Sequence, residues 1–153
     1  MVRRVYAGFR RVAMCARSRA TRVTLAHMHR SRLSTFVIDC KTADLDRAAE
    51  FWSRALGRAW KRQPDNDPKY RELAAAAEEP MVLVQSVEHP SRIHLDIESD
   101  DLDAEVARLE ALGAKRVAFV HRWWVMEAPT GQRFCVVRPQ RGPLAGTSAN
   151  EWP

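Results

Sequence analysis

The 153-residue chain is 46% hydrophobic, and this length and composition suit one globular domain or two small modules with a shared core. Its formal charge of +6 is concentrated in residues 1–32, which contain nine arginines and no acidic residue, so the remainder has 16 basic against 19 acidic residues. No apolar run approaches the ~20 residues of a membrane helix, and three cysteines without paired spacing argue against a disulfide framework or a structural zinc site.

The arginine-rich segment 1–32 shows no helical or alternating pattern that would place one face against a core. We expect a basic, disordered N-terminal extension, in which Met28 could be the true start because it directly precedes the first good strand. An organelle presequence and an arm that contacts nucleic acid or another anionic surface remain open as alternatives. For the domain itself we predict a cytoplasmic location, with neither a membrane nor a nucleic acid as partner.

Two segments of the chain repeat each other at an offset of 57 residues. Residues 36–46 align without a gap with residues 93–103, and apolar positions match apolar positions. In this alignment Asp39 corresponds to Asp96, whereas His94 corresponds to Val37. We interpret the pattern as an internal duplication of one structural unit.

The first copy predicts a strand, then a helix, then three further strands. Phe36 and Ile38 alternate with Asp39, so the apolar pair should face the helix and Asp39 the opposite side of the sheet. Asp44 is suited to cap the helix and Gly57 to end it. The predicted elements are a strand at 34–42, a helix at 44–57, a short strand within 58–69 followed by a loop, and a hairpin over 70–87.

The second copy repeats this order. Ile93, Leu95 and Ile97 are expected to face the helix, while His94 and Asp96 point to the other face of the strand. The predicted elements are a strand at 92–98, a helix at 101–112, and strands at 115–121, 123–128 and 133–138.

These elements define the predicted domain organisation. The domain should span 33–141, with module one at 34–90 and module two at 91–141. We expect residues 142–153 to be a loose tail, because only Leu144 and Trp152 offer apolar side chains to pack.

Several short motifs occur in the order typical of a known family. They are Leu33 to Cys40, Phe51-Trp52 with Ala55-Leu56-Gly57, His94-Leu95-Asp96, Asp100 to Val106, Leu112-Gly113-Ala114, and Ala128 to Val137. With the two β-α-β-β-β units, they resemble the vicinal oxygen chelate (VOC) superfamily of glyoxalase I, extradiol dioxygenases and bleomycin resistance proteins, and especially its glyoxalase-like domain, over residues 33–138. The resemblance implies an α+β fold whose two modules form a curled mixed sheet around a cleft, and it implies a homodimer.

In metal-using members of this superfamily, four corners of the cleft floor hold His, Glu or Gln and bind one divalent ion. By position these corners correspond to Val37, Gln85, His94 and Cys135. Valine offers no ligand atom, glutamine offers a neutral oxygen, and a thiolate is too soft for a hard cation. We therefore expect no metal or other cofactor; if a divalent metal does bind, His94 and Gln85 are its predicted ligands.

His94 is the predicted catalytic group. It shares the cleft face with Asp96, and Asp39 repeats Asp96 in the other module, so an imidazole with carboxylates nearby could act as an acid–base pair. The alternative is a set of structural hydrogen bonds that holds the strands in register. No corner carries a carboxylate, so the corner glutamate that serves as general base in glyoxalase-type proton transfer is missing.

Further candidate ligand-binding residues are expected on the cleft face of the sheet, with His94 and Asp96. Trp123 and Trp124 are neighbours on a strand and must face opposite sides, and we expect Trp124 to wall the cleft. Arg133 shares the face of Cys135 and could meet an anionic group, whereas Cys135 itself is more typical of a small buried residue than of a nucleophile.

We therefore predict a protein that binds a small molecule between its modules, as a lyase or isomerase with His94 as polarising or acid–base group. The predicted ligand-binding residues are Asp39, Gln85, His94, Asp96, Trp124, Arg133 and Cys135. A non-catalytic binding or sequestering protein of the bleomycin-resistance type remains the main alternative. An interaction module with a filled cleft is a third.

Overall fold

The computed structural model describes residues 28–62 and 67–153. In chain order its elements are β1 (His29–Cys40), α1 (Leu45–Leu56), β2 (Trp60–Arg62), β3 (Tyr70–Leu73), β4 (Met81–Ser86), β5 (Arg92–Ser99), α2 (Leu102–Ala111), β6 (Lys115–Val120), β7 (Trp123–Glu127), β8 (Arg133–Val137) and β9 (Asn150–Trp152). Each half thus has the predicted order β-α-β-β-β, and β9 is an addition at the end. That the two halves arose by duplication stays an interpretation of the sequence.

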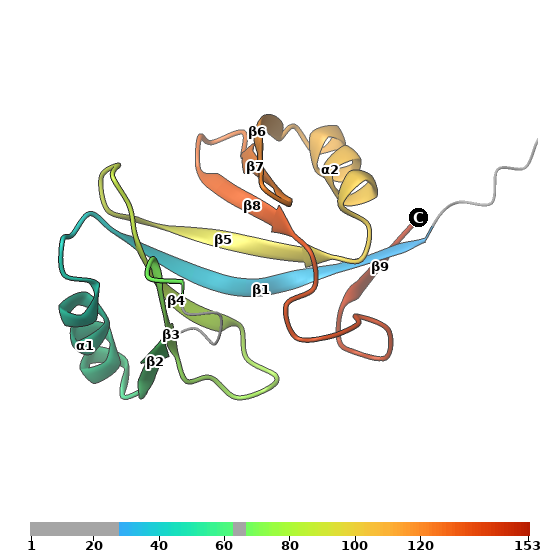
Figure 1. The fold of residues 1–153 in the computed structure, drawn as a ribbon. Coiled ribbons are helices and arrows are strands. Elements are labelled where there is room, and N and C mark those ends of the chain that lie inside the picture. Colours follow the sequence, from blue (N-terminus) through green and yellow to red (C-terminus); the bar gives the residue numbers. More distant parts are fainter. Residues whose placement is uncertain (1–27, 63–66) are drawn as a thin grey trace, which may run out of the picture.

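All strands belong to one curled mixed sheet, which confirms the predicted α+β fold. The strand order is β2-β3-β4-β1-β5-β8-β7-β6, with β9 paired to β1. The long strands β1 and β5 are antiparallel and join the two halves, while β4 runs parallel to β1 and β8 parallel to β5. Figure 1 shows β1 and β5 crossing the middle of the molecule, with α1 and α2 at opposite ends.

Both helices begin and end as their sequences predict. Asp44 accepts a hydrogen bond of 3.0 Å from the backbone N–H of Arg47, and Asp101 accepts one of 2.9 Å from Ala104. These carboxylates satisfy N–H groups that have no partner within the helix and lie at the positive end of its dipole. Gly57 ends α1 with a φ of 65°, a left-handed conformation that costs glycine little.

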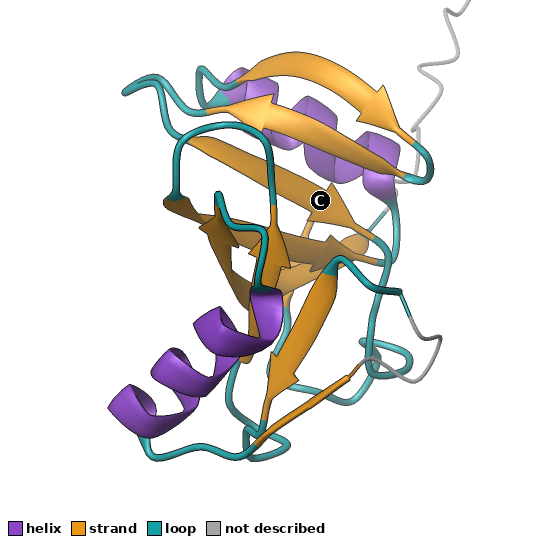
Figure 2. Cartoon of the chain, turned by 60° about the vertical axis from the view of Figure 1, so that its left-hand side comes forward, coloured by secondary structure: helices purple, strands orange, loops and turns teal. Residues whose placement is uncertain are grey.

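Each module has its own apolar core beneath its helix. In the first module α1 packs on β3 and β4, and in the second α2 packs on β7 and β8. The buried residues of the two cores are Leu45, Leu73 and Val84 in the first module, and Leu102, Val106, Leu109, Met126 and Val136 in the second. Figure 2 shows the two helices on separate parts of the molecule, one at the lower left and one at the top behind the strands. Within the described residues neither is long and apolar enough to span a membrane.

The middle of the helix-side sheet face is therefore uncovered. Ile97 packs against the core of the second module, but Ile93 is 60% exposed and Leu95 39% exposed. The expectation that all three face a helix is wrong for Ile93 and Leu95, because α2 lies over β7 and β8 rather than over the start of β5. Together with Leu33 and Phe36 on β1, which are also exposed, they form an apolar strip that we call the back strip.

Both predicted domain boundaries need correction. The first strand begins at His29 rather than at residue 34, because residues 29–31 pair with β9 and residues 31–32 with β5. Residues 29–32 thus belong to the domain, while the expectation for residues 1–27 lies outside the described residues. The C-terminal segment is not a loose tail, since Leu144 is buried and β9 adds to the sheet.

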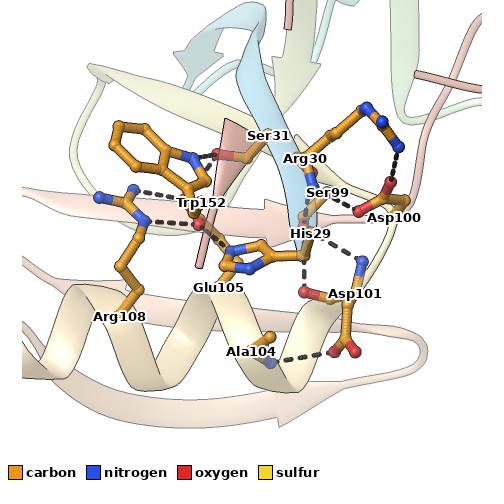
Figure 3. Close-up of polar contacts among 10 residues, drawn as sticks. All are labelled: His29, Arg30, Ser31, Ser99, Asp100, Asp101, Ala104, Glu105, Arg108 and Trp152. Carbon is orange, nitrogen blue, oxygen red and sulfur yellow. Dashed lines mark hydrogen bonds and ion pairs between the residues drawn. The ribbon is translucent and has the colours of Figure 1, made fainter. Parts of the chain in front are cut away.

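A buried polar cluster joins β1, α2 and β9 (Figure 3). The carboxylate of Glu105 is fully buried and accepts hydrogen bonds from Arg108, from Ser31 and from His29, the last at 2.9 Å. Burial alone would raise the pKa of Glu105, but these bonds outweigh it and hold the pKa below its ordinary value. Trp152 completes the cluster, because its indole N–H donates to the hydroxyl of Ser31 at 2.8 Å and its ring stacks with Arg108 at 4.0 Å.

Candidate functional site

The face of the sheet opposite the back strip forms an open cleft of about 670 Å³. This volume is in the range of small-molecule sites. Six of the predicted ligand-binding residues line it: Asp39, Gln85, His94, Asp96, Arg133 and Cys135. The corner position Val37 lines it as well, as do Leu83 and Val125.

Trp124 does not line the cleft, so this expectation is wrong. It packs against the core beneath α2 and contacts the ring of Phe119 at 5.1 Å. Its neighbour Trp123 lines the cleft instead. Alternation along the strand required opposite faces for the two tryptophans, but the pairing of Trp124 with buried Val136 decided which face each one takes.

His94 is held by a buried carboxylate from the other module. Its Nδ1 atom lies 2.9 Å from Oδ2 of Asp39, which is 1% exposed and also accepts a bond of 3.1 Å from Arg92. Burial alone would raise the pKa of Asp39, but the bonds and charges of His94 and Arg92 outweigh it and hold the pKa below its ordinary value. An ionised Asp39 can only accept, so Nδ1 of His94 carries the proton.

The other imidazole nitrogen, Nε2, faces the neighbouring side chains of Asp96 and Cys135. Nε2 of His94 lies 3.6 Å from Oδ1 of Asp96, and Asp96 stands directly opposite Cys135 between β5 and β8. Burial raises the pKa of Asp96 to about 6, with a further rise from the charge of Asp39 and a partial offset from His94 and Cys135. Burial, together with the charge of Asp96, also raises the pKa of Cys135, so the thiol stays protonated and is a poor nucleophile.

Gln85 and Tyr70 form a second polar group on the floor of the cleft. The Gln85 side-chain amide donates to the Tyr70 hydroxyl at 3.0 Å. Burial, followed by the charges of Asp67 and Asp96, raises the pKa of Tyr70 to about 12. The phenol is therefore protonated at neutral pH and can donate a hydrogen bond to a bound molecule.

The donor set at the centre of the cleft fits a transition-metal ion. Donor atoms of His94, Asp96 and Cys135 lie within 4.8 Å of one another, and Oδ1 of Asp96 is buried with no hydrogen-bond partner among the described residues. One nitrogen, one oxygen and one sulfur suit zinc or a similar ion rather than magnesium or calcium. Asp39 would then orient the ligating imidazole from behind. From the sequence we expect no metal, and His94 and Gln85 as ligands only if one binds; the fold gathers His94, Asp96 and Cys135 instead.

Comparison with known families identifies the domain. A sequence model described as the glyoxalase-like domain matches residues 35–137, about two thirds of the chain. The chain belongs to this family. The recognition of a glyoxalase-like domain of the VOC superfamily from sequence motifs is thereby confirmed.

Several solved structures are similar to this glyoxalase-like domain. The hypothetical protein BH1468 from Bacillus halodurans C-125 has 12% identity and a TM-score of 0.50, with 74% of this chain and 99% of that chain covered. Methylmalonyl-CoA epimerase from Mycobacterium tuberculosis has 21% identity and a TM-score of 0.47, with coverages of 71% and 87%. A glyoxalase/bleomycin resistance protein/dioxygenase superfamily member from Vibrio splendidus 12B01 has 18% identity and a TM-score of 0.41, with coverages of 69% and 98%. At 12% identity, the similarity to BH1468 indicates a common fold only. No curated protein matches the sequence.

The structure adds two residues to the site of the glyoxalase-like domain. Arg92 contacts Asp39, and its position two residues before His94 on the same strand was a signal available in the sequence. Tyr70 contacts Gln85, but it comes from β3, and nothing in its local sequence indicated this partner. Arg133 lines the cleft as expected, yet its guanidinium is paired with Glu127 at 2.9 Å.

Proposed function

We propose that this glyoxalase-like domain binds a small carbonyl-containing molecule in its cleft and catalyses proton transfer on it, as a lyase or isomerase. One observation carries the proposal: Asp39 holds Nδ1 of His94 at 2.9 Å, which leaves Nε2 directed to Asp96 within the cleft. This is the arrangement of an oriented acid–base group, since the buried carboxylate fixes the tautomer and stabilises the imidazolium.

The proposed chemistry assigns a role to each group. Nε2 of His94 takes a proton from a carbon next to the ligand carbonyl and returns it to the same or a neighbouring atom. The Tyr70 hydroxyl, oriented by Gln85, donates a hydrogen bond to the carbonyl oxygen as negative charge develops there. Asp96, whose pKa is about 6, can exchange the proton with His94 near neutral pH. A metal held by His94, Asp96 and Cys135 would occupy Nε2 of His94, and it would then supply Lewis-acid polarisation of the carbonyl oxygen in place of proton transfer by this nitrogen.

Deuterium exchange tests this proposal across a range of candidate substrates. A panel of small aldehydes, ketones and 2-oxo acids is incubated with the protein in D₂O, and proton NMR follows deuterium incorporation next to the carbonyl. We expect exchange for at least one compound, and a rate at least 100-fold lower in His94→Ala. The matched control is His121→Asn, which removes another cleft histidine and keeps a residue that tolerates the φ of 50° at this position. Unchanged exchange in His94→Ala would contradict the role of His94.

Sequestration without chemistry is the second candidate. The corner opposite His94 is Val37, and Leu83 and Val125 add further apolar lining, so one side of the cleft offers packing surface rather than catalytic groups. A ligand that raises the melting temperature of metal-free protein, with no deuterium exchange on any compound, would favour sequestration.

Elemental analysis of protein purified without chelator, with a thermal-shift series over divalent ions, decides whether a metal takes part. The third alternative, an interaction module, would have a cleft filled by side chains, and the open cleft with its polar groups argues against it.

The cellular location and the oligomeric state of the protein are also proposals. We propose a cytoplasmic location, because the described cysteines Cys40 and Cys135 are both free thiols. We also propose a homodimer, in which the back strip would be the surface removed from water.

A further inference from the structure

Trp123 is a large aromatic residue that the fold does not use to build its cores. Its neighbour Trp124 packs beneath α2, whereas neither apolar core of the described residues includes Trp123. Trp123 is instead half-buried and lines the cleft. Small-molecule sites combine apolar and aromatic walls with a few polar groups, so an indole that stays partly open to the cleft is a surface for a ligand to cover.

Strand register places the Trp123 side chain on the cleft face. In the pairing of β7, β8 and β5, Val125 lies opposite Cys135, and Cys135 lies opposite Asp96. Trp123 is two residues from Val125 on the same strand, so both side chains point to one face of the sheet. The ring of Trp123 also contacts the ring of His121, another residue of the cleft lining, with 5.5 Å between the centroids. The indole is therefore a wall of the cleft that holds the proposed acid–base centre.

A short turn fixes the position of this wall. His121 and Arg122 join β6 to β7, and His121 has a φ of 50°. A two-residue turn whose first residue has a positive φ matches the twist of the flanking strands and holds them in register. The imidazole of His121 is tilted by 49° to the indole, so it does not lie flat on the Trp123 ring.

One small molecule can reach from the acid–base centre to Trp123. Strand β8 separates β5 from β7, so these two strands lie about 10 Å apart across the sheet. The two-residue step from Val125 to Trp123 adds roughly 7 Å along β7, which puts the backbones of Asp96 and Trp123 about 12 Å apart in a flat sheet. Side chains that extend into the cleft shorten this span. A group a few bonds from the reacting carbonyl fits it.

The charge of the cleft lining limits what can lie on the indole. Cations as well as planar rings bind to the face of tryptophan. Five lysine and arginine residues line the cleft against three aspartates, so a cationic group would be repelled. An uncharged planar group gains from stacking on the indole without this repulsion.

From this arrangement we infer that the ligand of the cleft carries an uncharged aromatic or conjugated ring that stacks on Trp123. The inference rests on the proposed function in that it takes the same cleft to be the binding site. It adds the chemical class of the group attached to the reacting carbonyl, and it names β7 as the strand against which this group lies.

Two ketones that differ in one ring test the inference. Phenylacetone and cyclohexylacetone have the same number of carbon atoms, but only phenylacetone has a planar ring. Each is titrated into the full chain, stripped of metal, and saturation-transfer NMR gives the dissociation constant. We expect phenylacetone to bind at least threefold more tightly, although cyclohexylacetone is the more apolar molecule, because only a planar ring can stack.

Variants of Trp123 separate stacking from apolar packing. In W123L the dissociation constant of phenylacetone should rise about fivefold and the preference over cyclohexylacetone should disappear, whereas W123F should keep the preference. The matched control is F119L, which removes an exposed aromatic ring from β6, paired with Trp124 on the opposite face of the sheet. It should leave both dissociation constants unchanged. Circular dichroism checks that each variant is folded.

Three results would overturn the inference. They are equal or tighter binding of cyclohexylacetone to the wild-type protein, equal effects of W123L and F119L, and no saturable binding of phenylacetone. The outcome is separable from the proposed function, because His94→Ala should abolish deuterium exchange and leave the preference for phenylacetone intact.

Discussion

Asp39 and Asp96 contact the two nitrogens of one imidazole, but their pKa values shift in opposite directions. Asp39 receives hydrogen bonds and positive charge from His94 and Arg92, and these outweigh its burial. For Asp96 the opposing effects of His94 and Cys135 are too small to offset burial, so its pKa rises to about 6. Two carboxylates with separated pKa values at one site are typical of acid–base assignments in enzymes.

The raised pKa of Asp96 predicts a pH-dependent effect on stability. The folded state favours the neutral carboxyl, so the stability contribution of Asp96 is fully present below its unfolded pKa near 4 and is lost as the pH rises through 6. Asp96→Asn should therefore stabilise the metal-free protein by about 2 kcal/mol at pH 8 and by little at pH 4. Urea unfolding at the two pH values measures this difference.

The control for this measurement is Asp103→Asn, which removes an exposed carboxylate from the first turn of α2. It should change the unfolding free energy by no more than about 0.5 kcal/mol at both pH values. An Asp96→Asn protein that is less stable at pH 8 than the parent would show that the charged carboxylate is stabilised in the folded state.

At the scale of elements, β9 is the part that strand and helix patterns did not reveal. Three residues are too few for a recognisable alternation, and their partner β1 lies about 120 residues away in the chain. The two side chains named as the only apolar ones in this segment, Leu144 and Trp152, are nevertheless the ones that pack. Composition therefore indicated that Leu144 and Trp152 could be buried, and only the fold provided the surface against which they pack.

Trp152 should be the main anchor of β9. Trp152→Ala removes the ring from Arg108 and the hydrogen bond to Ser31, and leaves the hydroxyl beside buried Glu105 with one partner fewer. We expect a loss of about 2–3 kcal/mol in the free energy of unfolding, measured by urea denaturation. Glu151→Gln, on an exposed neighbour, is the control and should cost less than about 1 kcal/mol. Equal stability of the Trp152→Ala protein and the parent would mean that β9 adds nothing to the fold.

At the scale of the whole molecule, the two modules meet through β1 and β5, and neither helix covers the middle of this junction. On one face the junction carries the proposed acid–base centre, and on the other it carries the back strip. Apolar side chains exposed side by side are typical of surfaces that bind another protein, which supports the proposed homodimer.

The dimer has a direct test. Light scattering on the wild-type protein should give twice the 17.5 kDa of one chain. Leu95→Glu places a charge in the middle of the back strip and should give a monomer, because a buried unpaired carboxylate opposes association. Phe51→Glu, at an exposed aromatic residue on α1, should remain dimeric. A monomeric wild-type protein would rule out this assembly.

The sequence by itself determined the order of the elements from β1 to β8, the helix caps and the alternation of side chains along each strand, because these depend on contacts within a few positions of the chain. It therefore placed Asp39, His94 and Asp96 on one side of the sheet. Only the tertiary structure decided the rest. The pairing of β1 with β5 brought Asp39 to His94, that of β5 with β8 brought Cys135 to Asp96, and that of β7 with β8 exchanged Trp124 for Trp123 in the cleft. Strand register depends on the packing of all strands together, and a shift of one residue would turn each of these side chains to the other face.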